Sequence, residues 1–310
     1  MRDLTRGPIA GHIVALAVPI AVGMLVQTLY YLVDLYFVSR LGEVALAGVG
    51  AAGNLMFLVL ALNQMLSVGT MATVSHAAGA RDRDRVDLVF NQALALAAVL
   101  AVVTLVGGYL GLADLYIGSI GADAATVAAG ATYLRWFLPT MALQFAIAAM
   151  GAALQGTGIV KPTMVVQMLT VLVNVVLTPV LVAGWLTGRP MGVAGAGLAT
   201  TLAAATGVVM MTAYFVKLEH YVRFDASLLR PRLAVLRRML GIGIPAGGQF
   251  ALMFVYMAVI YAVIGVFGPA AQAGFGVGSR MMQAVFLPAM AVAFAAPAIA
   301  GQNFGARDAG

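Results

Sequence analysis

Charged residues are distributed along this sequence so that they leave eight long apolar intervals. Each interval runs between two neighbouring charges: 7–33, 44–80, 88–113, 136–160, 162–188, 190–216, 239–279 and 281–306. A helix rises about 1.5 Å per residue, so about 20 apolar residues cross the roughly 30 Å hydrocarbon core of a bilayer. Every interval is longer than that. The pattern therefore predicts an all-α membrane protein with eight transmembrane helices.

The composition agrees with this prediction and excludes several kinds of chemical site. Of the 310 residues, 63% are hydrophobic and 9% are charged, which excludes a water-soluble globular protein. The chain has no cysteine, so disulfides, cysteine-ligated zinc, iron–sulfur clusters and thiol catalysis are excluded together. The three histidines never occur at metal-binding spacing. We therefore expect neither a metal site nor a cofactor.

The cations lie in short loops between the apolar intervals, where they indicate orientation in the membrane rather than nucleic-acid binding. With a cytoplasmic N-terminus, thirteen of the 17 cations lie on the inner side: Arg2, Arg6, Arg81, Arg83, Arg85, Lys161, Lys217, Arg223, Arg230, Arg232, Arg237, Arg238 and Arg307. The other four, on the outer side, are Arg40, Arg135, Arg189 and Arg280. Because inner loops carry the excess of Lys and Arg, we expect the N-terminus inside and no nucleic-acid partner.

An internal repeat relates the first two expected helices to the last two. One constant shift along the chain, without a gap, aligns Pro19 with Pro245 and Tyr30 with Tyr256. The same 226-residue shift aligns the tetrad GARD at 79–82 with GARD at 305–308. Six helices precede the second copy, so both copies enter the membrane in the same direction, as parallel repeats about an axis along the membrane normal. The alternative is that two apolar helix pairs rich in Ala and Gly match by composition.

The repeat predicts how the chain is organised. Residues 1–217 form an N-lobe of six transmembrane helices, 218–238 form an amphipathic cytoplasmic linker, and 239–310 form the first two helices of a C-lobe. A complete second lobe would carry the chain to roughly 450 residues. We therefore expect this chain to be C-terminally truncated.

Asp34 is the acidic residue that lies inside an apolar span, whereas the other ten acids lie in loops or at helix ends. It is six residues before Arg40, hence about 9 Å inside the outer boundary. A lone buried carboxylate costs several kcal/mol unless it is protonated, binds a cation or accepts hydrogen bonds. Gln27, Tyr30 and Tyr31 share its helix face and predict a polar stripe toward the helix bundle. The alternative is a hydrated interfacial aspartate that caps the helix end.

The fifth expected helix carries a second polar stripe. Gln167, Thr170, Asn174 and Thr178 lie at i, i+3, i+7 and i+11, within about 60° of one another around the helix. Such a stripe would be unfavourable against lipid, so it faces protein or water. Two interpretations stay open: the side chains belong to an ion site, or they are interhelical hydrogen bonds worth under about 1 kcal/mol each.

Several segments together resemble the multidrug and toxic compound extrusion (MATE) transporters. They are VPIAVGMLVQTLYYLVDLYFVSRLGEVALAGVG (18–50), ALQGTGIVKPTM (153–164), NVVLTPVLVAGW (174–185), GVAGAGLATT (192–201), FLPAM (286–290) and GQNFGARD (301–308). The resemblance covers essentially the whole chain. It implies two six-helix lobes arranged as a V around a central cavity. It also implies antiport of small organic, often cationic, compounds against protons or sodium across the bacterial inner membrane, with membrane lipid as surroundings and a monomer as the working unit.

The same resemblance assigns roles to individual residues. Asp34 matches the acid of the family's VD motif, and Thr200 matches a further hydroxyl of the cation site in the first lobe. Asn174 is retained from an NxxxD motif, but Thr178 replaces its acid. Pro19 matches a proline where the family's first helix is proposed to bend. Because one carboxylate with neutral oxygen ligands suits a proton better than a sodium ion, we expect proton coupling.

Two other functions remain as alternatives. A flippase for lipid-linked oligosaccharides, from the same superfamily, would need Arg or Lys in the cavity to meet pyrophosphate, and the spans of this chain contain none. An intramembrane enzyme would need a nucleophile with a base, paired acids or a metal cluster at membrane depth. The single acid in the spans argues against an enzyme, so we expect a transporter.

Overall fold

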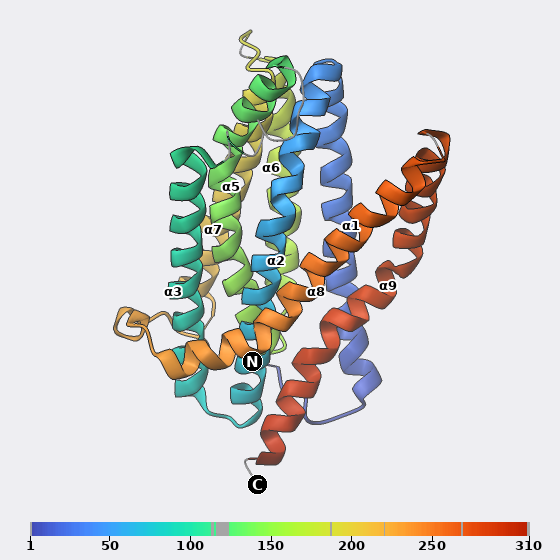
Figure 1. Ribbon diagram of the computed structural model, residues 1–310. Coiled ribbons are helices and arrows are strands. Elements are labelled where there is room, and N and C mark those ends of the chain that lie inside the picture. Colours follow the sequence, from blue (N-terminus) through green and yellow to red (C-terminus); the bar gives the residue numbers. More distant parts are fainter. Residues whose placement is uncertain are drawn as a thin grey trace.

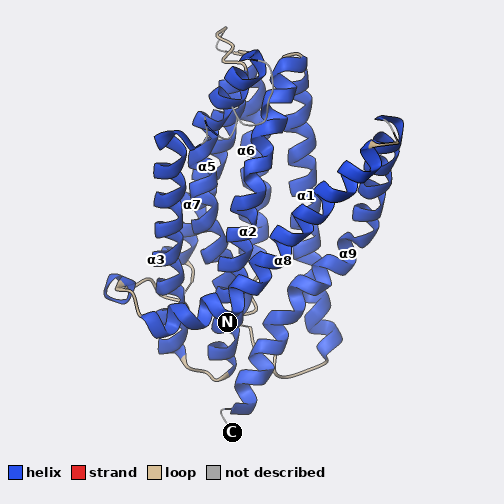
Figure 2. Ribbon diagram, in the orientation of Figure 1, coloured by secondary structure: helices blue, strands red, loops and turns tan. Residues whose placement is uncertain are grey.

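The computed structural model describes residues 2–112, 115, 124–186, 188–219, 221–267 and 269–308. Within these residues the regular structure is helical, and eight segments are long and apolar enough to cross a membrane. The helices are α1 (Ile9–Ser39), α2 (Glu43–Gly79), α3 (Arg83–Gly107), α5 (Ala124–Gly156), α6 (Lys161–Val182), α7 (Val193–Lys217), α8 (Leu233–Gly265) and α9 (Pro269–Asp308). A π-helical turn, Gly108–Leu112, follows α3, and a 3-10 turn, Ala226–Leu229, precedes α8. The predicted all-α membrane fold is confirmed (Figure 2).

Polar residues and glycines set the helix ends. Asp82 caps α3 by accepting a hydrogen bond from the backbone N–H of Arg85, at 3.0 Å. Gly42 separates α1 from α2 with φ +103°, a conformation that favours glycine. Pro162 lies in the first turn of α6, where its missing N–H would have had no helical partner. These local signals divide one apolar chain into separate spans.

Helices α1 to α7 stand side by side, whereas α8 and α9 lean across them (Figure 1). α8 packs on α2, and α9 packs on both α1 and α2. The upper ends of α8 and α9 in this view point away from the upper ends of α1 to α7, and the two groups meet below. The arrangement is an open V in which α1 and α2 supply the N-lobe surface that meets α8 and α9.

The two copies of the repeat have helix limits that agree to within three residues. The repeat shift carries α1 onto 235–265, and α8 covers Leu233–Gly265. It carries α2 onto 269–305, and α9 covers Pro269–Asp308. The predicted parallel repeat is thus confirmed at the level of whole helices.

The copies also contact each other reciprocally. A Cβ atom at Gly79 of α2 would clash with the carbonyl oxygen of Gln302 in α9, and one at Gly305 of α9 would clash with the carbonyl oxygen of His76 in α2. The repeat shift relates Gly79 to Gly305 and His76 to Gln302. The α2–α9 crossing therefore lies on a pseudo-two-fold axis, and glycines let the two backbones approach closely there.

The contacts between α2 and α8 and those between α9 and α1 are likewise related by the repeat. On α2 and α8, Gly69 lies against the backbone of Met239, and Gly243 lies against the backbone of Met65. The repeat-equivalent positions of Gly69 and Met65 are Ala295 and Ala291 in α9, which are buried in a cluster with Leu16 and Ala17 of α1. Small residues thus occupy both flanking crossings.

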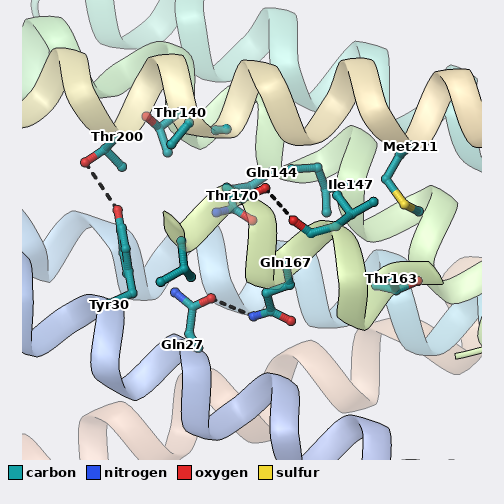
Figure 3. A pocket seen from close by; sticks show the side chains of 14 residues that line it. Gln27, Tyr30, Thr140, Gln144, Ile147, Thr163, Gln167, Thr170, Thr200 and Met211 are labelled. Carbon is teal, nitrogen blue, oxygen red and sulfur yellow. Dashed lines mark hydrogen bonds between the residues drawn. The ribbon is translucent and has the colours of Figure 1, made fainter. Parts of the chain in front are cut away.

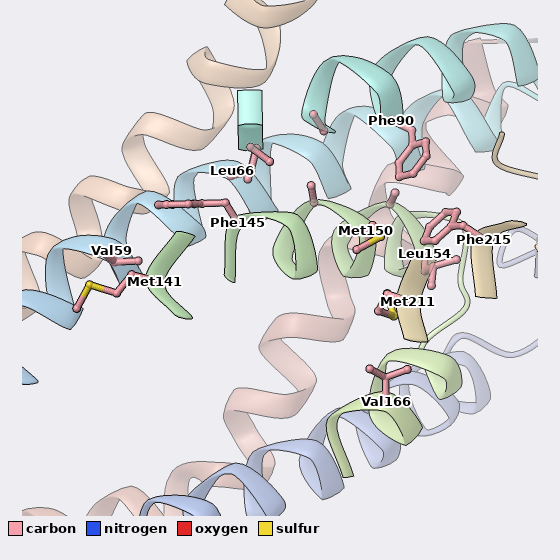
Figure 4. Close-up of a cluster of buried hydrophobic side chains, with 14 of the residues drawn as sticks. Val59, Leu66, Phe90, Met141, Phe145, Met150, Leu154, Val166, Met211 and Phe215 are labelled. Carbon is pink, nitrogen blue, oxygen red and sulfur yellow. The ribbon is translucent and has the colours of Figure 1, made fainter. Parts of the chain in front are cut away.

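The main hydrophobic core lies inside the N-lobe, between α2, α3, α5 and α7 (Figure 4). Phe90 of α3 stacks on Phe215 of α7, with ring centroids 4.7 Å apart and planes inclined by 10°. Phe145 and Leu154 of α5 are fully buried in the same cluster, with Leu154 near Phe215 and Phe145 near Leu66 (Figure 4). α5 packs on α2, α3 and α7, and so joins the helices that form this core.

The expected linker, 218–238, is shorter in the structure, because residues 233–238 belong to α8. Its backbone is held by side chains of α3 instead of by helical hydrogen bonds. Asn91 donates to the carbonyl of Arg223 at 2.9 Å and accepts from the N–H of Asp225 at 3.0 Å. Gln92 donates to the carbonyls of residues 228 and 230 and accepts from the N–H of residue 232. These amides attach the linker to the N-lobe.

Candidate functional site

Asp34 lies near the end of α1, on the face that also carries Tyr30 one turn earlier. Its Oδ1 atom is buried and has no hydrogen-bond partner among the described residues. The carboxyl therefore does not cap the helix end through this oxygen. A carboxyl oxygen without a partner at this depth is unfavourable unless it takes up a proton or a cation.

Thr200 connects three helices, and one of its partners is Tyr30, which lies one turn before Asp34 on α1. The Tyr30 hydroxyl of α1 donates to Thr200 Oγ1 of α7 at 3.2 Å, and the Asn174 amide of α6 donates to the same oxygen at 3.4 Å. The Thr178 hydroxyl donates to Asn174 Oδ1 at 3.2 Å. Asn174 and Thr178 are both 0% exposed. Residues expected from separate parts of the sequence thus form one hydrogen-bonded network.

The network contains neutral groups only. Thr178, which stands where the related motif has an acid, uses its hydroxyl hydrogen to bond Asn174. Thr200 donates its own hydrogen to the carbonyl of Ala196 at 3.0 Å, so its oxygen remains an acceptor for Tyr30 and Asn174. Asp34 is consequently the acidic group beside this network of neutral side chains.

The inner parts of the two stripes also meet. Gln167 of α6 donates to Gln27 of α1 at 2.7 Å, and Gly23 leaves room for this pair because a Cβ there would lie 3.0 Å from Gln167 Oε1. Thr170 donates to the carbonyl of Val166 in its own helix, at 2.8 Å. The α1 and α6 stripes are therefore joined directly by the hydrogen bond between Gln27 and Gln167.

The structure describes the surroundings of Pro19, the expected hinge, but not those of Tyr31, which was expected in the polar stripe. Pro19 is buried inside α1, which continues as one helix through it. The side chain of Tyr31 lies outside the described part of the chain. The hinge role expected for Pro19 stays a prediction.

A cavity of about 150 Å³ lies between α1, α5, α6 and α7 (Figure 3). Its described lining consists of Gln27, Tyr30, Thr140, Gln144, Ile147, Thr163, Val166, Gln167, Thr170, Val171, Thr200, Ala203, Ala204 and Met211. Figure 3 shows Tyr30 and Thr200 at one end of the cavity, with Thr163 and Met211 at the other. The cavity thus begins beside the Thr200 network and runs along α6 away from it.

Three polar lining residues were not expected from the sequence. Thr140 and Gln144 lie one turn apart on α5, and Thr163 lies one turn before Gln167 on α6. A periodic search for polar residues in the apolar spans could have found them, because all three continue helix faces that point inward.

Comparisons with known proteins agree with this architecture. The MatE family model matches residues 19–180. The chain is 25% identical over 295 residues to the probable multidrug resistance protein YoeA of Bacillus subtilis (strain 168), covering 94% of this chain and 64% of that protein. The chain thus spans somewhat less than two thirds of that relative's length.

Two solved structures are also similar. The crystal structure of a MATE variant with a proline-to-alanine substitution has a TM-score of 0.92 at 28% identity, over 99% of this chain and 68% of that chain. The outward-facing conformation of a multidrug resistance MATE family transporter of the MOP superfamily has a TM-score of 0.89 at 27% identity, over 99% and 67%. The resemblance stated from the sequence motifs is confirmed.

Proposed function

Because this chain belongs to the MatE family, we propose that it exports small organic cations by antiport against protons, with Asp34 as the coupling group. The names of its relatives support export of several compounds, since YoeA is named a probable multidrug resistance protein. The observation that carries the coupling role is the buried, unpartnered Oδ1 of Asp34, one turn from the network around Thr200. We propose the bacterial inner membrane as its location.

Coupling follows if one carboxyl serves two ligands in turn. When Asp34 is ionised, its charge stabilises a cationic substrate in the cleft between the lobes. When it takes up a proton from the outside, that attraction is lost and the substrate leaves. The proton then leaves toward the cytoplasm and the carboxylate is restored. Transport results because the two states of the carrier differ in affinity for the two ligands.

Protons suit the proposed site better than sodium does. A sodium ion favours several oxygen ligands that together carry negative charge, but the network one turn from Asp34 contains only neutral hydroxyls and an amide. The Thr178 hydroxyl, which replaces an acid, already donates to Asn174. A proton needs only the carboxylate and a neighbour that tolerates both charge states.

The orientation proposed here has the N-terminus and the linker in the cytoplasm. The lower end of the molecule in Figure 1, where the N-terminus, the C-terminus and the linker lie together, is then the cytoplasmic end. The exposed Trp185, just after the end of α6, would then lie at the outer interface that tryptophan prefers, whereas Trp136 lies about three turns inside α5. The V consequently opens toward the outside.

The direct test uses this chain in proteoliposomes with a fluorescent organic cation. We expect Asp34→Asn to lower efflux driven by an imposed pH gradient at least about tenfold, which corresponds to about 1.4 kcal/mol of lost coupling. The matched control is Glu43→Gln, which removes an exposed carboxyl from the first turn of α2 and should leave efflux unchanged.

Two outcomes would contradict the proposal. Wild-type efflux by Asp34→Asn would remove Asp34 from the coupling step. Efflux driven by a sodium gradient without any pH gradient would replace the proton as the coupling ion.

A further inference from the structure

The polar stripe of α6 extends to the end of the helix that we assign to the cytoplasm. Thr163 lies in the first turn of α6, and from it polar residues recur at Gln167, Thr170, Asn174 and Thr178. The sixteen residues from Thr163 to Thr178 span about 22 Å of helix axis. Over this distance one face of α6 offers a hydroxyl or an amide on every turn. The stripe is therefore far longer than a single ion site requires.

The cavity along this stripe has the size of a few water molecules. A water occupies about 30 Å³ in the liquid, so a cavity of about 150 Å³ holds about five. Sites for drug-sized molecules measure about 300–1,000 Å³. In this conformation the cavity is therefore large enough for water molecules but too small for a drug-sized organic cation.

The lining of the cavity also suits water. Eight of its fourteen described lining residues carry a hydroxyl or an amide, and none carries a charge. Thr163 Oγ1 is buried and has no hydrogen-bond partner among the described residues. A buried hydroxyl beside a cavity large enough for water satisfies its hydrogen bonds there. The unpartnered hydroxyl lies at the end of the cavity remote from Thr200 (Figure 3).

Tyr30 connects the lining of this cavity with the part of α1 that carries Asp34. Its side chain lines the cavity and its hydroxyl donates to Thr200, and Asp34 lies one turn farther along the same face of α1.

We propose that the N-lobe cavity is a water-filled path through which the proton of Asp34 leaves toward the cytoplasm. This inference rests on the coupling role proposed for Asp34. In the step itself the O–H bond of the Asp34 carboxyl breaks, the proton passes to the hydrogen-bonded water and out past Thr163, and the carboxylate remains. The drug takes a separate route between the lobes.

Water access can be tested without any transport assay, because the chain has no native cysteine. We would make Thr163→Cys and Thr170→Cys, add Ag⁺ from the cytoplasmic side of membrane vesicles, and follow loss of later labelling by N-ethylmaleimide after denaturation. The controls are Val165→Cys, on the exposed face of the same helix, and Ala149→Cys, which is 0% exposed in the core. The path predicts at least about tenfold faster reaction at positions 163 and 170 than at both controls.

Equal rates at positions 163, 170 and 149, or reaction from the outer side only, would overturn the path. The Ag⁺ reaction should persist in the Asp34→Asn background, because it needs water and not coupling. Fast reaction combined with normal transport by Asp34→Asn would therefore reject the proposed coupling while leaving the water path intact.

A second pair of variants tests the path in operation. Thr163→Leu should fill the end of the cavity and slow proton-driven efflux at least about tenfold, whereas Thr163→Ser should retain the wild-type rate. The dye affinity of both variants, measured by fluorescence, should equal that of the wild type, because the drug does not enter this cavity. Wild-type efflux by Thr163→Leu would overturn the proposal.

Discussion

The helix pair α1–α2 and its repeat α8–α9 have similar lengths and share a glycine at the α2–α9 crossing, but they differ in chemistry. Gly79 and Gly305 make equivalent contacts across the pseudo-two-fold axis. At the position of Asp34, however, the second copy has Ile260. Packing between the copies needs small residues on both sides, since each backbone approaches the other. Coupling to an ion needs only one carboxyl, so the second copy can lose it.

The largest expected loss of stability comes from replacing the glycines that both copies carry at the α2–α9 crossing. Gly79→Leu and Gly305→Leu should each lower stability by about 1–3 kcal/mol or more, because the new side chain meets a backbone carbonyl that cannot move aside. The two losses should be similar, as the crossing is symmetric. Thermal unfolding in detergent measures them. Gly248→Leu, where a Cβ meets nothing within 4 Å, is the control. Strongly unequal losses at 79 and 305 would show that the crossing is not symmetric.

A smaller loss of stability should come from a position at which the two copies of the repeat carry different residues. Gln302 is buried, donates to the carbonyl of Gly156 at 3.0 Å and accepts from the N–H of Leu4 at 3.1 Å. Gln302→Leu leaves both backbone groups unsatisfied and should cost about 1–3 kcal/mol. Trypsin should then cleave the N-terminal segment faster.

Gln249→Leu supplies the matched control for this change, because Gln249 is exposed on α8. It should alter neither the unfolding temperature nor the rate of trypsin cleavage. If Gln302→Leu behaves in the same way, the hydrogen bonds of Gln302 do not hold the N-terminal segment.

The smallest expected loss of stability concerns the two tyrosines that the repeat aligns, because only one of them should contribute. Tyr30 donates to Thr200, whereas Tyr256 is 60% exposed. Tyr30→Phe should lower stability by about 0.5–1.5 kcal/mol, and Tyr256→Phe should have no measurable effect. Thermal unfolding in detergent again provides the measurement. Equal effects would mean that the hydrogen bond to Thr200 contributes nothing to the N-lobe.

The sequence predicted the spans and the repeat because both depend on local properties. Apolar length defines a helix in a membrane, and a repeat at one constant shift along the chain is found without knowledge of packing. The stripe on α6 was likewise visible as a helical period. The contact of Tyr30 with Thr200, by contrast, joins residues 170 positions apart, and only the packing of α1 against α6 and α7 brings them together.

The path of the linker was also beyond the sequence alone. Asn91 and Gln92 lie in the apolar span of α3, where amides commonly bond neighbouring helices. In the structure their amides bind the backbone of the linker instead. The length of α8 depends on this attachment, which ends at residue 232, directly before the helix begins.

Proton release on substrate binding tests the central claim most directly. A saturating amount of the fluorescent organic cation would be added to purified protein in weakly buffered solution, and the pH would be followed with an indicator dye. If Asp34 exchanges its proton for the substrate, the wild type and Glu43→Gln should release protons on binding, and Asp34→Asn should release none while still binding the dye. Equal release by Asp34→Asn and the wild type would contradict the account.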